Sequence, residues 1–173
     1  MRIRLYILLT ICFVSLLFVV APNFIKQEDK LLKIEYKQLT KEARTQIDCL
    51  ADNIYYEAGW EPTDGRIAVA LVTLNRVQDP RYPKDICSVV KQKINSTCQF
   101  SWFCEGKKHI TSSRLYEEAQ NIALYVYANY ENLADITHGA LFYHADYVNP
   151  RWKLDKTTVI GRHIFYKESD RKQ

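Results

Sequence analysis

The sequence has little surplus charge of either sign. Its formal net charge is +4. Two of the positive charges are Arg2 and Arg4, and from Cys49 onward basic and acidic residues nearly balance. Proteins that bind nucleic acid carry a basic surplus or stripe, because they must neutralise phosphates. The composition therefore indicates that nucleic acid is not a partner of this chain.

Patterns typical of metal ligands are also missing. The cysteines are spaced too widely for a zinc site, which needs tight Cys pairs with a second Cys or His pair. Asp146 and Asp155 belong to acidic clusters, but neither lies in a recognisable calcium-loop pattern. We expect no metal and no cofactor, with calcium held by such carboxylates as the open alternative.

Of the five cysteines, Cys12 lies in an apolar run and the other four follow it. An even number of cysteines in an oxidising compartment is typical of disulfides. Cys49, Cys87, Cys98 and Cys104 allow three ways of pairing. Proximity in sequence favours Cys98 with Cys104, which leaves Cys49 with Cys87.

The apolar run, residues 5–21, is uncharged and follows Arg2 and Arg4. This layout is typical of a secretory signal or a signal anchor. Pro22 is a poor residue for the position after a cleavage site, so we expect an uncleaved anchor. The basic residues ahead of the run favour a cytoplasmic N-terminus. The rest of the chain would then be exported to the periplasm or the extracytoplasmic face of the inner membrane, with membrane contact through this run.

The chain is long enough to form one domain with a substantial hydrophobic core. Apolar residues recur at helical spacing in four segments, and later segments are rich in β-branched and aromatic residues. The predicted helices are 47–58, 63–77, 83–90 and 113–130, and the predicted strands are 140–144 and 157–166. We expect an α+β fold that is mainly helical with a small late β-sheet. The expected organisation is an anchor at 1–24, a partly helical stalk at 25–46, a catalytic domain at 47–168 and a tail at 169–173.

Glu57 is the most unusual residue of the first predicted helix. It shares a helical face with Leu50, Asn53 and Ile54, which should be buried. Burial and a position in the last helical turn both raise the pKa of a carboxyl group. A carboxyl group that keeps its proton near neutral pH can act as a general acid. The structural alternative is an ion pair with Arg66 or Arg76.

Aromatic and polar residues gather in three places around this candidate. The first flanks Glu57, the second lies in a loop between Cys98 and Cys104, and the third follows a predicted strand. Such side chains can stack on sugar rings and hydrogen-bond to them. The candidate substrate-binding residues are Asn53, Tyr56, Trp60, Gln99, Phe100, Ser101, Trp102, Tyr143, His144 and Tyr147.

Several ordered blocks of the sequence resemble one family. They include CLADNIYYEA at 49–58, LNRV at 74–77, CQFSW at 98–102, YHADYV at 143–148 and IGRHIFY at 160–166. The pattern is similar to that of the SleB-type cell-wall hydrolases, known as spore cortex-lytic enzymes, and covers roughly residues 49–167. Gly59-Trp60 departs from it, since family members often have Arg-Gly or a similar small pair there.

The resemblance implies a lysozyme-like α+β fold and cleavage of the bond between N-acetylmuramic acid and N-acetylglucosamine in peptidoglycan. It makes Glu57 the catalytic residue of a lytic transglycosylase that forms 1,6-anhydro-muropeptides. Asn53, Gln99, Ser101 and Tyr143 would orient the glycan. Hydrolysis would instead need a second carboxylate, for which Glu61, Asp64 and Asp146 are the candidates.

Two other functions stay open at this point. Asp48-Cys49 opens the first predicted helix, so Cys49 could be a peptidase nucleophile with His144 or His163 as its base. The chain could also be a wall-binding module without turnover. A thiol count tests the first alternative, and the effect of Glu57→Gln on function tests the second.

Overall fold

The computed structural model describes residues 36–106 and 109–169. The chain divides into two units, Met1–Leu39 and Thr40–Gln173, and the second holds every element discussed below. The predicted anchor at residues 5–21 and Cys12 lie outside the described residues. Within the described residues no helix has the length and apolarity required to cross a membrane.

Helix α2 (Lys41–Ala58) is the central element of the second unit. Its N-cap is Thr40, whose hydroxyl accepts a hydrogen bond of 3.2 Å from the backbone N–H of Ala43. The helix therefore begins earlier than the predicted start at residue 47. The first turns lack buried apolar residues, which is why periodicity alone missed them. Segment 41–46, assigned to the stalk from sequence, belongs to this helix.

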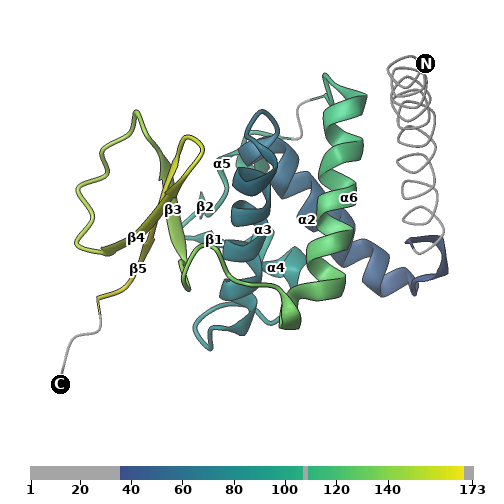
Figure 1. The fold of residues 1–173 in the computed structure, drawn as a ribbon, viewed down its shortest axis with the longest axis horizontal. Coiled ribbons are helices and arrows are strands. Elements are labelled where there is room, and N and C mark those ends of the chain that lie inside the picture. The colour runs from purple at the N-terminus through teal and green to yellow at the C-terminus, as the bar shows by residue number, and fades with distance from the viewer. Residues whose placement is uncertain (1–35, 107–108, 170–173) are drawn as a thin grey trace, which may run out of the picture. The chain divides into compact units, whose positions relative to one another are not determined.

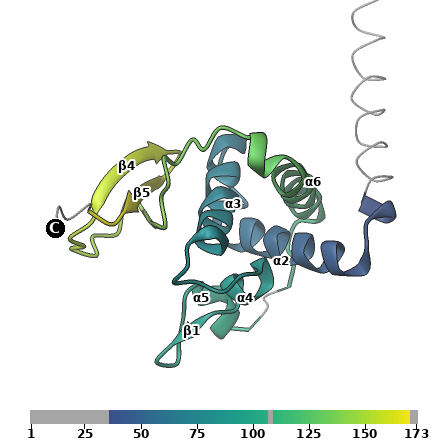
Figure 2. The same ribbon diagram turned by 90° about the horizontal axis from the view of Figure 1, so that it is seen from below.

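Two further long helices pack against α2 (Figures 1 and 2). Helix α3 (Thr63–Gln78) follows Pro62, and the Ser112 hydroxyl caps the start of α6 (Ser113–Asn129). The sequence predicts the bounds of both helices to within a residue. Shorter elements complete the helical part: α4 (Ile86–Val90), β1 (Lys93–Ile94), β2 (Thr97–Cys98), α5 (Ser101–Cys104) and η1 (Tyr130–Asn132). The loop expected between Cys98 and Cys104 is thus the short helix α5.

The late sheet has the order β3-β5-β4 and is antiparallel throughout. Its strands are β3 (Phe142–Ala145), β4 (Asp155–Ile160) and β5 (His163–Lys167), so the single strand predicted at 157–166 is a hairpin. One face packs on α3, where Ala68 and Val72 meet Ala140 and Phe165. The prediction of a mainly helical fold with a small late sheet is confirmed.

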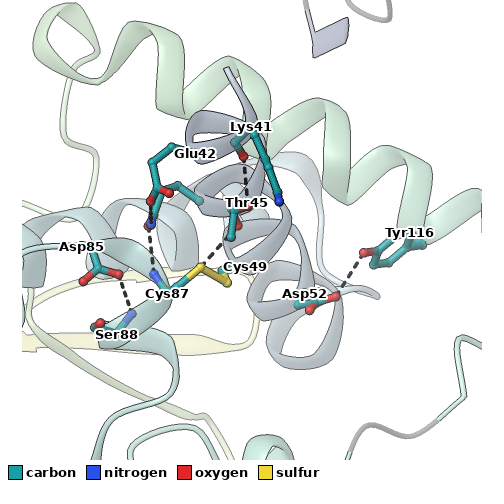
Figure 3. The surroundings of a disulfide bond; sticks show 10 residues. Lys41, Glu42, Thr45, Cys49, Asp52, Asp85, Cys87, Ser88 and Tyr116 are labelled. Carbon is teal, nitrogen blue, oxygen red and sulfur yellow. Dashed lines mark hydrogen bonds between the residues drawn. A yellow bond between two sulfur atoms is a disulfide. The ribbon is translucent and has the colours of Figure 1, made fainter. Parts of the chain in front are cut away.

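Both disulfides have the predicted connectivity. Cys49–Cys87 joins α2 to α4, and Cys98–Cys104 links β2 to the end of α5. Figure 3 shows Cys49 well inside α2, one turn after Thr45, with Cys87 beside Ser88. The backbone N–H of Cys87 donates to Gln46 Oε1 at 3.0 Å, which adds a second link between the two helices.

Candidate active site

Glu57 lies in the last turn of α2, where the sequence places it, and its side chain is half-buried. The hydroxyl of Tyr143 on β3 donates a hydrogen bond of 3.1 Å to Glu57 Oε2. Two candidate residues far apart in sequence are therefore in contact. This bond links the end of α2 to the sheet.

The pKa of Glu57 is raised, chiefly because burial disfavours the charged carboxylate. The hydrogen bond from Tyr143 and the charge of Arg76 act in the opposite direction, and the charge of Glu105 adds to the rise. Burial and the charge of Glu57 also raise the pKa of Tyr143 well above its ordinary value, so its hydroxyl stays a donor. The site thus holds a carboxyl group suited to general acid catalysis.

We predict that Tyr143→Phe moves the alkaline limb of the pH–rate profile to higher pH. The hydrogen bond that this variant lacks favours the charged carboxylate, so the pKa of Glu57 rises further without it. The rate should fall by about tenfold, because the carboxylate loses the hydroxyl donor that orients it.

The matched control is Tyr166→Phe, since the Tyr166 hydroxyl contacts His144 instead of Glu57. An assay of glycan cleavage across pH checks both variants. Equal profiles for the parent and Tyr143→Phe would contradict the assignment.

Arg76 is the buried cation that acts on Glu57 through its charge. Its Nε donates to the carbonyl of Leu141 at 2.8 Å, and its guanidinium lies 5.2 Å from the ring centre of Phe100. Arg66, the other candidate partner, instead pairs with Glu118 at 2.7 Å. The ion-pair alternative for Glu57 is thus reduced to a charge interaction with Arg76, which lowers the pKa without cancelling the effect of burial.

Three residues expected to contact substrate are buried. Asn53 is fully enclosed: its Nδ2 donates to Thr73 Oγ1 at 3.2 Å, and its Oδ1 accepts from Trp102 Nε1 at 3.1 Å. Phe100 is 3% exposed and Trp102 is 6% exposed. These three residues leave almost no surface for a sugar, so that part of the prediction is corrected. Their role is to position others, because Trp102 stacks on Tyr56 with ring centres 4.7 Å apart.

An open cavity of about 250 Å³ adjoins Glu57. It is lined by residues 55–61 at the end of α2 and by His109 and Thr111 ahead of α6. Tyr56 and Trp60, both predicted to bind substrate, are in this wall, and Trp60 is 83% exposed. His109 and Thr111 were missed from sequence, because nothing in their local pattern shows that they face Glu57.

His144 lies on the opposite face of the sheet from Tyr143, because side chains alternate along a strand. Its Nδ1 donates to the carbonyl of Ala145 at 2.8 Å, and its Nε2 shares a hydrogen bond of 3.0 Å with the Tyr166 hydroxyl. It also stacks on Tyr166, with ring centres 5.2 Å apart. His144 and Tyr143 therefore face opposite sides of the sheet, and contact of His144 with substrate stays a prediction. Its ring is part of the packing on the outer face of the sheet.

The remaining candidates lie on exposed segments. Ser101 is exposed at the start of α5, and Gln99 is half-buried just before it. Tyr147 is 78% exposed after β3, with the Arg162 guanidinium 5.6 Å from its ring centre. Their contact with substrate stays a prediction.

The three candidates for a second carboxylate differ in their surroundings. Glu61 Oε2 accepts from the backbone N–H of Arg162 at 2.9 Å, and Asp146 pairs with the Arg162 guanidinium at 3.2 Å. Asp64 is exposed in the first turn of α3. Of the three, only Glu61 lines the cavity together with Glu57. Glu61 also joins the α2–α3 connection to the β4–β5 turn.

Cys49 cannot serve as a nucleophile in this structure, because its sulfur is bonded to Cys87. It also lies in the middle of α2, away from the helix start assumed for the peptidase alternative.

A count of reactive thiols in the denatured, unreduced chain is expected to find a single one, Cys12. Three reactive thiols would mean that one of the bridges is absent in solution.

The fold and the site thus define a small α+β domain with a glutamate of raised pKa beside an open, aromatic-lined cavity. A family model described as Cell Wall Hydrolase matches residues 60–166, a range that begins just after Glu57. The chain belongs to this family and is of the SleB type.

Relatives and solved structures agree with this assignment. The chain is 30% identical over 122 residues to the spore cortex-lytic enzyme of Halalkalibacterium halodurans, which covers 69% of this chain and 34% of the relative. The corresponding enzyme of Bacillus subtilis is 29% identical over 122 residues, covering 69% and 36%. The chain therefore spans about a third of the length of these relatives.

Among solved structures, the catalytic domain of the germination-specific lytic transglycosylase SleB from Bacillus anthracis is similar, with a TM-score of 0.56 and 26% identity. That likeness covers 75% of this chain and 98% of that domain. The catalytic domain of the Bacillus cereus SleB protein gives a TM-score of 0.55 at 26% identity, covering 75% and 94%.

Proposed function

We propose that this chain cleaves the bond between N-acetylmuramic acid and N-acetylglucosamine in peptidoglycan, as a lytic transglycosylase with Glu57 as its acid. The observation that carries the proposal is a carboxyl group with a raised pKa at the edge of an open cavity. The likeness to a catalytic domain described as a lytic transglycosylase supports the same reaction, as does the lysozyme-like fold that the sequence resemblance implies.

In the proposed reaction Glu57 first gives its proton to the glycosidic oxygen, and the bond from that oxygen to C1 of the muramic sugar breaks. The N-acetyl group of the same sugar stabilises the positive charge at C1. The Glu57 carboxylate then takes the proton from the C6 hydroxyl, whose oxygen bonds to C1 and closes the 1,6-anhydro ring. Glu57 ends protonated, as it began. The hydrogen bond from Tyr143 orients the carboxylate between the two proton transfers.

Hydrolysis is the second candidate, because Glu61 lines the cavity with Glu57. In that reaction a second carboxylate would activate a water molecule or act as the nucleophile. Glu61 already accepts the Arg162 N–H, which gives it a structural role that does not depend on chemistry. We therefore favour the transglycosylase, for which one carboxyl group is sufficient.

The deciding experiment is digestion of purified peptidoglycan, with the released muropeptides identified by mass. The proposal predicts anhydro ends, which are one water lighter than the reducing ends made by hydrolysis. Reducing ends alone would establish hydrolysis instead, and Glu61→Gln would then be the next variant. No glycan cleavage by the folded protein would favour the wall-binding module.

We propose further that the enzyme works outside the cytoplasm, with peptidoglycan glycan strands as its partner and with residues 5–21 as a membrane anchor. Two disulfides in the described part support an oxidising compartment. We propose that the reaction needs no metal. Asp146 and Asp155, considered for calcium from sequence, are engaged by Arg162 and Ser169 respectively.

A further inference from the structure

We propose that the Cys98–Cys104 bridge is a site of thiol–disulfide exchange that controls catalysis. A dithiol reductant opens the bridge at Cys104, Trp102 then leaves its place against α2, and glycan cleavage slows while the domain stays folded. The inference rests on the proposed function for its effect on cleavage. The exchange itself and the release of Trp102 can be measured without that function.

The two bridges differ in how far a reductant can reach their sulfurs. Cys104 is exposed at the end of α5, whereas its partner Cys98 is 9% exposed. Cys49 and Cys87 are both buried, at 7% and 9% exposure, and their bridge joins α2 to α4 (Figure 3). Exchange requires that a thiolate reach one of the two bonded sulfurs. A dithiol is therefore expected to reduce Cys98–Cys104 and to leave Cys49–Cys87 intact.

The exchange transfers two electrons from one dithiol to the bridge. A thiolate of the reductant attacks Cys104 Sγ, the bond between the two cysteine sulfurs breaks, and Cys98 leaves as a thiolate. The second thiol of the reductant then attacks the mixed disulfide and releases Cys104. The reductant ends as a disulfide, and its two protons end on the two cysteines.

The bridge closes a segment that has little regular structure of its own. Its cysteines are six residues apart, and between them lies only α5, a helix of four residues. Helices this short are marginal without outside contacts. Phe100 and Trp102, at 3% and 6% exposure, hold the segment on the domain. Without the bridge, the population of molecules with this segment open should rise by roughly 10–100-fold, because a bridge restricts the open conformations.

Trp102 connects this segment to the last turns of α2. Its Nε1 donates to Asn53 Oδ1 at 3.1 Å, one turn before Glu57, and its ring stacks on Tyr56 with ring centres 4.7 Å apart. Asn53 in turn donates to Thr73 on α3 at 3.2 Å. Opening of the segment therefore removes two contacts that fix the position of Glu57. Because Trp102 acts through α2, it is a positioning residue.

Opening of the segment should also change the acidity of Glu57. The charged and titratable groups around this carboxyl are Tyr143 on β3, Arg76 on α3, Glu105 after α5, and Glu61 and His109 in the cavity wall. Glu105 follows Cys104 directly, and its charge raises the pKa of Glu57. Withdrawal of Glu105 and entry of water both lower the pKa of Glu57. Reduction should therefore move the alkaline limb of the pH–rate profile to lower pH, opposite to the shift expected for Tyr143→Phe.

The test treats the full-length protein with dithiothreitol under native conditions, traps free thiols with iodoacetamide and locates the label by mass. We expect new label on Cys98 and Cys104 and none on Cys49 or Cys87. The initial rate of glycan cleavage should fall by about two- to tenfold, the effect of losing one aromatic contact. The loss should lie in kcat rather than KM, because the acid is displaced. Reoxidation with oxidised glutathione should restore the rate.

Tryptophan fluorescence follows the segment independently of cleavage. The chain has three tryptophans, of which Trp102 is buried, whereas Trp60 and Trp152 are 83% and 42% exposed. Reduction should shift the emission to longer wavelength, and Trp102→Phe should remove that shift. Urea denaturation of the reduced protein should still show a cooperative transition.

The matched variant is Cys98→Ser/Cys104→Ser, which has no bridge to reduce. It should cleave at the rate of the reduced parent, with or without dithiothreitol. If this variant does not fold, reduction of the parent still decides, because the parent is folded before the reductant is added.

The inference is overturned if reduction of Cys98–Cys104 leaves cleavage and emission unchanged, if Cys49–Cys87 opens as fast, or if the reduced protein no longer unfolds cooperatively. Failure of the proposed function looks different, because a protein that cleaves no glycan when oxidised would still exchange at Cys104 and release Trp102. Cleavage by the oxidised protein that does not change on reduction would keep the function and remove the control by the bridge.

Discussion

Replacing Glu57 with Gln is expected to lower the rate of glycan cleavage by about two to four orders of magnitude, the usual contribution of a general acid. Glutamine has the same shape and can still accept the hydrogen bond from Tyr143, but it has no proton of suitable acidity to give. Release of muropeptides from purified peptidoglycan, followed over time, measures the loss. A rate within a few-fold of the parent would remove Glu57 from the mechanism.

The same variant should fold at least as stably as the parent above the raised pKa of Glu57. A carboxyl group whose pKa is higher in the folded state stabilises folding below its unfolded pKa, and this contribution is lost as pH rises through the folded pKa. Glutamine does not ionise, so the parent should lose stability relative to the variant as pH increases. Urea denaturation of both proteins at acidic and mildly alkaline pH measures the difference. A variant less stable at both pH values would mean that lost activity reflects lost structure.

The second large effect is expected from Gly161→Ala, which should destabilise the domain by about 2–4 kcal/mol. Gly161 has φ +57°, and an added Cβ would overlap Glu61 Oε2. The backbone strain of a left-handed alanine is one part of the cost, and displacement of Glu61 from the Arg162 N–H is the other. Urea denaturation measures the loss of free energy of unfolding.

Gly139→Ala is the matched control for that variant. Gly139 has φ +78°, but nothing lies within 4 Å of the position that its Cβ would take. It therefore reports the strain of the backbone alone, about 1–2 kcal/mol. If both variants lose the same free energy, the contact between Glu61 and the β4–β5 turn contributes nothing to stability.

Much of the helical part could be predicted from sequence, because burial repeats at helical spacing. Residues 63–77 and 113–130 carry that signal and match α3 and α6 closely. The start of α2 does not carry this burial signal, because its first turns are solvated and only the Thr40 cap marks the boundary. The two disulfides were predictable because four cysteines leave few pairings and one pair is close in sequence.

The site was predictable only where a residue's own position in its element determines its surroundings. Glu57 qualifies, because helical spacing alone places it among buried residues. Tyr143 and His144 are neighbours in sequence, and only the register of β3 against β5 shows which of them faces Glu57. Thr111 is held at the cavity by hydrogen bonds to Tyr55, a tertiary contact that no local pattern contains.

The hydrogen bond between Tyr143 and Glu57 also determines how the enzyme should fail on heating. The sheet is attached to the helices by a small apolar cluster and by individual polar contacts, among them Arg76 with Leu141 and Glu61 with Arg162. Opening of the sheet would withdraw Tyr143 while the helices stay folded. Catalysis would then be lost reversibly at temperatures below the main unfolding transition, so the working range of the enzyme is narrower than the stability of its helices.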